Sequence, residues 1–395
     1  MRIEIRDVQH TRICGSKDTV CHWPRQGGLW YWGDDEILVG HIHAPCQYKN
    51  RDEVAHGQHG MFSRAVVRLN RSLDLGQTWP EELTQVVYDY TLPAAEQRRR
   101  LHVDDYTLDT GPARSAIDMT GPDSIMIFGR AFVGKERTNS QGVAYNDQII
   151  WGYRSADRGR TWEDTPSIVW PNHTEWITEL ANNTMRMPDG TLMGWFVASG
   201  PDEGLHGQGT ILHPQMYMSV DQGQTWHYVS DIYRDPFRAI ACSYPHILAL
   251  PSGRLMCTMG LWMTPYSGLR WISINYSDDG GLTWSEPRRI CRWGVSPYPL
   301  RLQDDRLVIL YARRYANVYG MACITSEDEG ATWSEEYLLR DDAGHNRLYA
   351  DIGYPVATQL RDGRVFTAYY YQLDDPDVPW AGGRKFIAGT FFHLK

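Results

Sequence analysis

Short runs of hydrophobic and β-branched residues alternate with polar turns along the whole chain. Six times, an apolar run leads into a turn rich in Asp and Gly and is followed by a second apolar run. The six copies begin at Gly28, Ser115, Asn183, Pro245, Pro299 and Pro355. A turn of this composition between two β-rich runs is the strongest short-range signal for a β-hairpin. The pattern therefore predicts six hairpins and an all-β chain, because no segment of useful length has the helical period.

An octapeptide of the form Ser-x-Asp-x-Gly-x-Thr-Trp follows each of the first five hairpins. The copies are SLDLGQTW, SADRGRTW, SVDQGQTW, SDDGGLTW and SEDEGATW, which begin at Ser72, Ser155, Ser219, Ser277 and Ser326. The Asp can bond backbone N–H groups of its own turn, the Gly supplies a positive φ, and the Trp fills space between sheets. We therefore interpret the octapeptide as scaffold rather than as a catalytic site.

Six hairpins and five octapeptides predict a six-bladed β-propeller that forms a single domain over residues 1–395. The interval between the first two octapeptides is longer than the others, which predicts an insertion around residues 84–112. After the sixth hairpin the chain has residues for only one strand, and the opening segment RIEIRDVQHTRIC supplies a strand without a hairpin. We expect this N-terminal strand to complete the last blade, because a closed ring has no exposed sheet edge.

Composition and charge restrict the partners and the compartment. The net charge of -9 disfavours nucleic acid and anionic membranes. No run approaches the ~20 apolar residues that span a bilayer, and the first ten residues carry charge where a signal peptide is apolar. The seven cysteines are scattered singly, which is typical of free thiols in a reducing compartment. We expect a cytoplasmic protein, or a secreted or periplasmic one if a leader has been removed, with no cofactor.

Candidate chemistry gathers where the innermost strands begin, because a propeller has a natural concavity at the mouth of its central channel. Reading back from each turn by the same offset gives Arg25, Arg114, Glu179, Tyr244, Tyr298 and Tyr354. The recurring Tyr-Pro pair could instead be a repeat feature that packs the start of the strand. The ends of inner hairpins add Arg130, Arg313 and Arg314, which could bind a carboxylate or be solvated charges at the rim.

Histidines are concentrated near the N-terminus, where half of the 14 precede residue 103. His41 and His43 alternate along one strand and share a face, and His56 and His59 follow shortly after. These side chains could act as general acid or base near neutral pH, bind a metal, or fill a wet channel. No spacing among them is a recognised zinc signature, so we expect no metal site.

Five octapeptides in a six-hairpin chain resemble the Asp-box repeats of the sialidase superfamily, over essentially the whole length. The resemblance implies three arginines that grip a sugar carboxylate, a tyrosine nucleophile paired with a glutamate, and an aspartate acid. It places the nucleophile at Tyr354 in DIGYPVATQLRDG and the first arginine at Arg25 in WPRQGG. Bidentate arginine suits a carboxylate, and a tyrosine nucleophile is an exception to the two-carboxylate rule of glycosidases.

The arginine triad of that family is not intact in this chain. Gly260 and Tyr298 stand where the second and third arginines belong, and His56 and His59 stand in the region of the acid. The fourth hairpin has no glutamate, and Glu179, one blade earlier, could replace it. These departures favour a sister activity on another sugar.

The resulting hypothesis is an exo-acting glycoside hydrolase that cleaves a terminal, acidic sugar from a glycan. Its nucleophile is Tyr354, which Glu179 or Asp351 tunes, and the substrate anion is bound by Arg25 and Arg114. The proton is handled by His43, His56 or His59. Two alternatives stay open: a propeller polysaccharide lyase that uses His, Tyr and Arg for β-elimination on a uronic acid, and a non-catalytic glycan-binding propeller.

Overall fold

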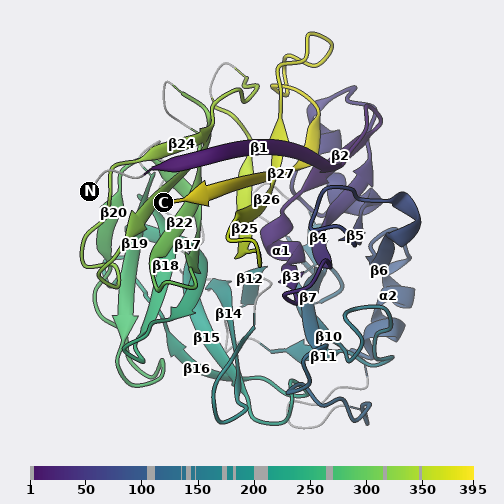
Figure 1. Ribbon diagram of the computed structural model, residues 1–395. Coiled ribbons are helices and arrows are strands. Elements are labelled where there is room, and N and C mark those ends of the chain that lie inside the picture. The colour runs from purple at the N-terminus through teal and green to yellow at the C-terminus, as the bar shows by residue number, and fades with distance from the viewer. Residues whose placement is uncertain are drawn as a thin grey trace.

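The computed structural model describes residues 4–104, 112–134, 136–138, 144–146, 148–170, 176–180, 184–199, 212–263, 270–314, 318–346 and 349–395. Its strands form six antiparallel sheets around a central axis, and a separate two-stranded hairpin (Figure 1). The strands β25, β12 and β3 lie near the centre of the ring, and β20, β16 and β6 lie at its rim. The predicted six-bladed propeller is therefore confirmed.

The blades follow one another in chain order. Blade 1 contains β2 (Thr19–His22), β3 (Leu29–Tyr31), β4 (Ile37–Pro45), β5 (Val66–Ser72) and β6 (Gln85–Asp89). Blade 2 contains β7 (Ile125–Ala131), β10 (Ile149–Ser155) and β11 (Ser167–Val169), and the hairpin of β8 (Glu136–Thr138) and β9 (Ala144–Asn146) branches from it. Blade 3 contains β12 (Trp176–Leu180), β13 (Met185–Arg186), β14 (Leu192–Ser199), β15 (Leu212–Ser219) and β16 (His227–Asp231).

The other three blades have four strands each in the described residues. Blade 4 contains β17 (Ile240–Ala249), β18 (Leu255–Met263), β19 (Arg270–Ser277) and β20 (Arg288–Cys291). Blade 5 contains β21 (Gly294–Arg301), β22 (Leu307–Arg313), β23 (Gly320–Ser326) and β24 (Tyr337–Arg340). Blade 6 contains β25 (Gly353–Gln359), β26 (Val365–Gln372), β27 (Lys385–Leu394) and β1 (Ile5–Cys14).

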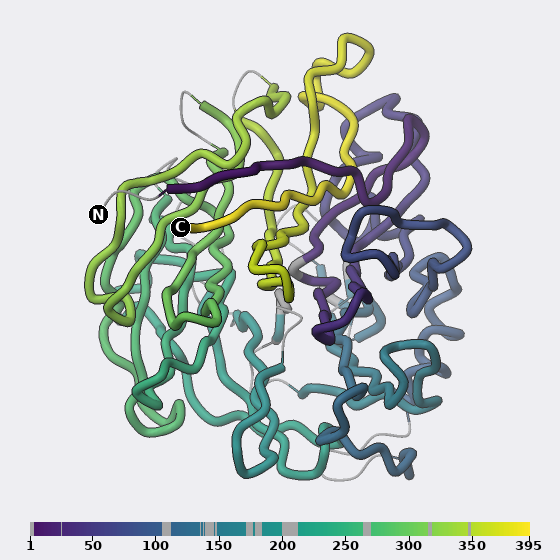
Figure 2. Tube along the Cα trace, viewed as in Figure 1, coloured from purple at the N-terminus to yellow at the C-terminus, as the bar shows by residue number. Residues whose placement is uncertain are grey.

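The ring closes through the N-terminal strand, as the hairpin count predicts. Strand β1 pairs antiparallel with β27, from Ile5 opposite Leu394 to Cys14 opposite Ile387. The two strands run side by side across the ring in Figure 1 and, as a purple and a yellow tube, in Figure 2. Blade 6 is thus built from both ends of the chain, and its outer edge is a strand made by the first residues.

In the part of the chain that the structure describes, two α-helices interrupt the all-β pattern. The short helix α1 (Pro24–Gly27) separates β2 from β3 in blade 1, and it begins with a proline, which suits the first helical position. A Cβ on Gly27 would lie 1.9 Å from the carbonyl carbon of Gly40, so only glycine allows this close approach to β4. The helix α2 (Ala94–Leu101) lies in the stretch where an insertion was expected and consists of good helix formers. It is too short for its period to be visible in the sequence.

The 3-10 turns are also confined to connections. They are η1 (Arg51–Val54), η2 (Met61–Arg64) and η3 (Glu81–Leu83).

In blades 1 to 5 the Asp box lies between the last two strands of the blade and closes a hydrogen-bonded turn. In the third box, Ser219 Oγ donates to Asp221 Oδ1 at 2.7 Å and accepts from the Gly223 amide at 2.8 Å. Asp221 also accepts from the amide and hydroxyl of Thr225 at 2.9 and 2.6 Å. The indole of Trp226 packs against Phe128 of the neighbouring blade, with ring centroids 5.3 Å apart. The box therefore stabilises its own turn and places a tryptophan between two blades. These contacts agree with a structural rather than a catalytic role for the box.

Removing one box carboxylate is expected to destabilise the propeller without touching its centre. Asp221→Ala removes charge-assisted hydrogen bonds from a half-buried turn, and we expect the free energy of unfolding to fall by about 2 kcal/mol. Val220→Ala is the matched control, because Val220 is the adjacent residue and its side chain is exposed. Denaturant unfolding of both variants measures the difference, and equal stability of the two would contradict the scaffold role.

Candidate functional site

A repeated bulge shapes the mouth of the channel. In blades 1, 4, 5 and 6 a residue with positive φ precedes a proline at the innermost strand or helix. These residues are Trp23, Tyr244, Ser296 and Tyr354, with φ of 55°, 59°, 56° and 54°. In blade 6 the pairing with β26 steps from Gly353 opposite Tyr370 to Val356 opposite Ala368, so that Tyr354 and Pro355 lie outside the ladder. Strained backbone of this kind is concentrated at functional sites in proteins, and here it recurs around one axis.

A buried carboxylate, Asp351, is the centre of the polar network beside this bulge. Its Oδ1 accepts from the hydroxyl of Tyr370 at 2.6 Å and lies 3.6 Å from a guanidinium nitrogen of Arg314. Its Oδ2 lies 3.7 Å from Lys385 Nζ and 3.4 Å from His56 Nε2. Arg314 donates further to the hydroxyl of Tyr370 and to the carbonyl of Ile352, both at 2.6 Å. The network fixes the segment that leads into Tyr354.

The charges of this network are shifted by burial and by each other. Burial acts to raise the pKa of Asp351, but Lys385, His56 and Arg314 outweigh it and hold that pKa well below its usual range. Burial raises the pKa of Tyr370 well above its usual value, so this hydroxyl stays protonated and donates a hydrogen bond to the carboxylate of Asp351. Burial also lowers the pKa of the Lys385 ammonium. The carboxylate is ionised at neutral pH and lies beside the Arg314 guanidinium and the Lys385 amino group.

Tyr354 lies at the edge of this network, and its side chain is 7 % exposed. Its hydroxyl donates to the hydroxyl of Tyr244 at 3.3 Å, and the guanidinium carbon of Arg314 lies 5.4 Å from the centre of its ring. The ring of Tyr244 in turn lies over Gly260, where a Cβ would come within 2.9 Å of Tyr244 Cδ2. Gly260, at the position that the resemblance assigns to a second arginine, thus leaves room for the ring of Tyr244.

The opposite wall comes from blades 1 and 2. The ring of Trp23 lies 6.0 Å from that of Tyr354 and 4.8 Å from that of His56. Arg130 lies behind Trp23, with its guanidinium carbon 5.2 Å from the indole. Trp23, Arg130, Tyr244, Arg314 and Tyr354 belong to five different blades, and only the region around the axis brings five blades into contact. The cluster therefore lies at the mouth of the channel.

Comparisons with known proteins agree with this architecture. The model of the BNR/Asp-box repeat matches residues 276–286, which hold the fourth box. The Hadza microbial sialidase Hz136 superposes with a TM-score of 0.59 at 17% identity, over 95% of this chain and 65% of that one. A variant of the NanB sialidase from Streptococcus pneumoniae superposes with a TM-score of 0.54 at 13% identity, over 95% and 68% of the two chains. This chain has the sialidase fold.

A protein of unknown function from Dyadobacter fermentans DSM 18053 is similar to this chain over almost its full length. It superposes with a TM-score of 0.66 at 19% identity, over 99% of both chains. The present chain corresponds to only 65% of the length of Hz136. No curated protein sequence matches the chain. In the described residues, no helix is both long and apolar enough to cross a membrane.

Several residues singled out from the sequence meet in the mouth cluster. Tyr354 contacts Tyr244, and His56 contacts Asp351. The ring of Trp23 lies against both Tyr354 and His56, and Arg130 lies against Trp23. Arg314 belongs to the same cluster, whereas its neighbour Arg313 forms an ion pair with Glu336 in blade 5, at 3.1 Å. Arg313 is thus neutralised by its own blade.

Other candidates lie elsewhere in the sialidase fold. Tyr298 is two residues beyond the bulge of blade 5, which Ser296 occupies, and its ring lies tilted against that of His246, with the ring centroids 4.3 Å apart. His43 faces Cys21 instead of His56. His59 lines a surface pocket with Glu53 and Arg64.

The remaining candidates are Arg114, Arg25 and Glu179. Arg114 lies in an irregular, partly exposed segment of blade 2, in the position where an innermost strand was expected. Arg25 is part of α1 and Glu179 part of β12, but their side chains lie outside the described residues.

The cluster also contains residues that the sequence reading did not select. They are His22 on β2, Trp23 at the start of α1, Tyr370 on β26 and Lys385 on β27, and they approach Asp351 or Tyr354 only in the folded ring. One signal was available for Trp23: it precedes a proline, as Tyr244 and Tyr354 do. Aligning the blades on this proline, rather than on the hairpin turn, would have selected Trp23 in blade 1.

One subset of the cluster has the composition of a metal site. The side chains of His22, His56 and Asp351 each offer a ligand atom within 4.8 Å of the others. Both ring nitrogens of the buried His22 also lack a hydrogen-bond partner among the described residues. However, Lys385 and Arg314 lie 3.7 and 3.6 Å from the same carboxylate, and like charges at this range repel a further cation. The electrostatics of the mouth favour an anion.

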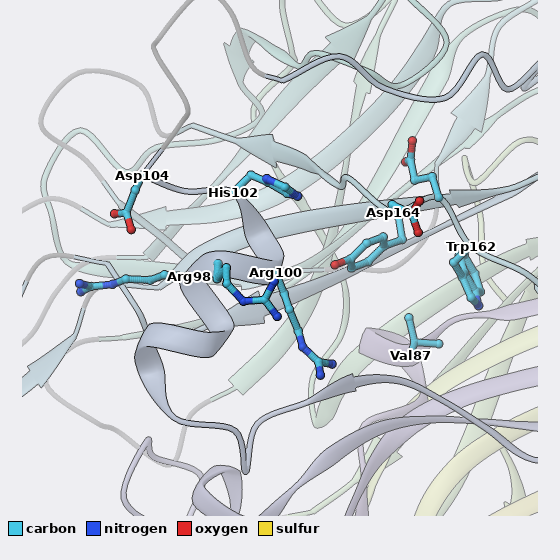
Figure 3. Close-up of a pocket in the computed structure, with 10 residues that line it drawn as sticks. Val87, Arg98, Arg100, His102, Asp104, Trp162 and Asp164 are labelled. Atoms are coloured by element: carbon cyan, nitrogen blue, oxygen red, sulfur yellow. The ribbon is translucent and has the colours of Figure 1, made fainter.

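A second cavity, of about 670 Å³, lies at the periphery beside α2 (Figure 3). It is lined by Arg98, Arg100 and His102 on one side and by Trp162 and Asp164 on the other. Its cations already have partners: Arg98 donates to the carbonyl of Val133, and Arg100 pairs with Glu96. We regard it as a gap between helix and blade, because the strained bulges and the convergence of five blades are at the mouth instead.

Proposed function

We propose that the protein is an exo-acting glycoside hydrolase that removes a terminal, acidic sugar from a glycan, with Tyr354 as its nucleophile. The observation that carries the proposal is a tyrosine hydroxyl held at the mouth of the channel, next to a cluster with more cations than anions. Arg314 lies 5.4 Å from the ring of Tyr354 and stabilises the phenolate that forms as the hydroxyl gives up its proton. Glu179, on β12 of blade 3, is kept as the candidate base for that proton.

The acidic substrate follows from the charge balance. Among the described side chains of the cluster, Arg314, Lys385 and Arg130 are cationic and Asp351 is the anion. An anionic sugar neutralises this excess, and a carboxylate gains most from it because guanidinium groups bind planar oxyanions. A neutral nucleophile such as a tyrosine hydroxyl also avoids the repulsion that a carboxylate nucleophile would meet from such a substrate.

His56 supplies the proton in this mechanism. Its side chain is 43% exposed, and its Nε2 lies 3.4 Å from a carboxylate oxygen of Asp351, a suitable partner for a histidine that acts as general acid. In the first step Tyr354 Oη bonds to the anomeric carbon while the glycosidic bond breaks, and His56 protonates the departing oxygen. In the second step His56 takes a proton from water, and the water oxygen bonds to the anomeric carbon while the bond from that carbon to Tyr354 Oη breaks. The base that took the phenolic proton in the first step returns it to Tyr354, which restores the hydroxyl.

A screen of glycosides against polyuronates tests the proposal. Purified protein is incubated with chromogenic glycosides of acidic and of neutral sugars, and the first product is followed by NMR. We expect release of the chromophore from an acidic glycoside and a free sugar with an intact ring. Turnover of neutral glycosides alone would overturn the acidic substrate, and binding of acidic glycans without any turnover would favour a glycan-binding propeller.

A polysaccharide lyase is the second candidate, and the His56–Asp351 pair is what favours it. A histidine supported by a buried carboxylate can remove the proton next to a uronic acid carboxylate, which Arg314 would neutralise. The lyase product contains an unsaturated uronate that absorbs in the ultraviolet, and the hydrolase product does not. The same screen therefore separates the two reactions by the product formed from polyuronates.

A further inference from the structure

Four side chains with metal-binding chemistry meet at the seam of the ring, away from the mouth cluster. They are Cys14, Cys21, His41 and His43, and each offers a sulfur or nitrogen within 4.8 Å of the other three. Cys21 and His41 are buried, and Cys14 and His43 are half-buried. We propose that these side chains form a structural Cys2His2 zinc site that fastens blade 6 to blade 1.

The separations of these atoms fit one ion at their centre. The two sulfurs lie 3.8 Å apart, Cys14 Sγ lies 3.2 Å from His41 Nε2, and Cys21 Sγ lies 3.4 Å from His43 Nδ1. A tetrahedral zinc site has Zn–S bonds of about 2.3 Å and Zn–N bonds of about 2.0 Å, which give edges of roughly 3.8 Å between sulfurs and 3.5 Å between sulfur and nitrogen. The cluster thus has the size of a zinc coordination shell. Two thiolates and two imidazoles are also the ligand set that zinc prefers over magnesium or calcium.

The strands explain why the four side chains converge. Cys21 on β2 stands directly opposite His43 on β4 in the antiparallel ladder, so their side chains project to the same face. His41 is two residues away from His43 on the same strand and shares that face. Cys14 reaches the face from the last residue of β1. Because the ligands come from three strands, their spacing along the chain does not resemble a zinc-finger motif.

One tautomer of His41 suits metal ligation. Its Nδ1 lies 3.1 Å from the carbonyl of Ile42, which accepts a hydrogen bond when this nitrogen carries the hydrogen. Nε2 then presents its lone pair to the cluster, as zinc-bound histidines do when a carbonyl orients the other nitrogen. Asn70 Oδ1 lies 2.8 Å from the same Nε2 and is the competing partner: with the hydrogen on Nε2, the cluster would be only a hydrogen-bonded group.

The position of the site gives it a structural task. Cys14 belongs to the sheet of blade 6, whereas Cys21, His41 and His43 belong to the sheet of blade 1. A metal here links the first and last blades at the seam, next to the β1–β27 pairing that closes the ring. Cys21 also directly precedes His22 of the mouth cluster, so the ion would hold one wall of the candidate active site in place.

Metal content and thiol reactivity test the site without any assay of activity. The full chain is purified under reducing conditions without added metal, and we expect about one zinc ion per chain by elemental analysis. Chelation should remove the ion, make two thiols newly reactive toward a thiol reagent, and lower the melting temperature; added zinc should reverse all three changes. Cobalt(II) in place of zinc should give the visible absorption bands of a tetrahedral thiolate complex.

Matched variants locate the ion. Cys14→Ser and Cys21→Ser should lose most of the zinc, whereas Cys46→Ser should keep it, because Cys46 is a buried cysteine of the same blade outside the cluster. Three results would overturn the proposal: zinc content that is unchanged in both cluster variants, metal-free protein that takes up no zinc or cobalt, or a Cys14–Cys21 disulfide in the purified chain. The use of wild-type protein for chelation keeps the test valid if a cysteine variant fails to fold.

Discussion

Tyr354→Phe is expected to lower kcat by about 10³-fold or more on an acidic glycoside, on the scale that removal of a nucleophile has in other enzymes. The substitution removes one oxygen and leaves the ring that Trp23, Tyr244 and Arg314 contact. In the folded chain the hydroxyl makes a 3.3 Å hydrogen bond to Tyr244, whose loss costs no more than about 1 kcal/mol of stability. The variant should therefore melt near the temperature of the unmodified protein while losing turnover. Steady-state kinetics and a melting curve on the same preparation measure both effects.

Tyr369→Phe is the matched control for this experiment. Tyr369 is a fully buried tyrosine of the same blade, and its hydroxyl bonds to Thr390 rather than to the mouth cluster. We expect this variant to keep its kcat. If Tyr354→Phe also keeps full activity, Tyr354 is not the nucleophile, and the lyase mechanism based on His56 becomes the stronger one.

Much of the fold could be predicted because its signals are local. Each Asp box forms its own turn through contacts within eight residues, so the sequence of the box is sufficient to identify it. The closure of the ring followed from counting, since one strand at each end of the chain lacked a partner and β1 indeed pairs with β27. The helix α2 was missed because eight residues that make few buried contacts leave no periodic pattern.

The site was harder to predict, because its geometry depends on one-residue bulges and on contacts between blades. A common offset from the hairpin turn placed Tyr354 and Tyr244 at the bulge, but it chose Tyr298 where the structure has Ser296. The pairing of His56 with Asp351 joins residues that are far apart in the sequence and come from different blades, and nothing local distinguishes His56 from His59. Lys385 can be recognised as part of the site only from the folded structure, where it is buried beside the carboxylate of Asp351. The order of the blades therefore predicts where a mouth lies, but not which polar side chains turn into it.

Asp351→Asn is expected to have the largest effect on stability, about 3–5 kcal/mol at neutral pH, because it leaves Arg314 and Lys385 buried without their counter-charge. It should also reduce kcat by about 10²-fold, since His56 loses the carboxylate that supports its imidazolium. Denaturant unfolding and steady-state kinetics measure the two effects separately. If both quantities stay unchanged, Asp351 is not the centre of the network.

The pH dependence of this effect has a defined sign. The pKa of Asp351 is lower in the folded chain than in the unfolded one, so its contribution to stability is complete above the unfolded value of about 4. The contribution is lost as the pH falls through the lower, folded value. The stability difference between the unmodified protein and Asp351→Asn should thus be constant from pH 5 to 7, as about one pH unit above 4 suffices for ionisation, and should shrink in stronger acid.

Two further variants separate a role of the Asp351 charge from a general disturbance of blade 6. Asp342→Asn breaks the ion pair between Arg340 and a carboxylate that is 55% exposed, and we expect it to cost less stability than Asp351→Asn because water can solvate this carboxylate. Combining Asp351→Asn with Lys385→Met removes a buried cation together with the anion, so part of the lost stability should return. Activity should not return with it, because the double variant still lacks the partner of His56. A double variant that is as unstable as Asp351→Asn alone would show that Lys385 is not the charge that the carboxylate balances.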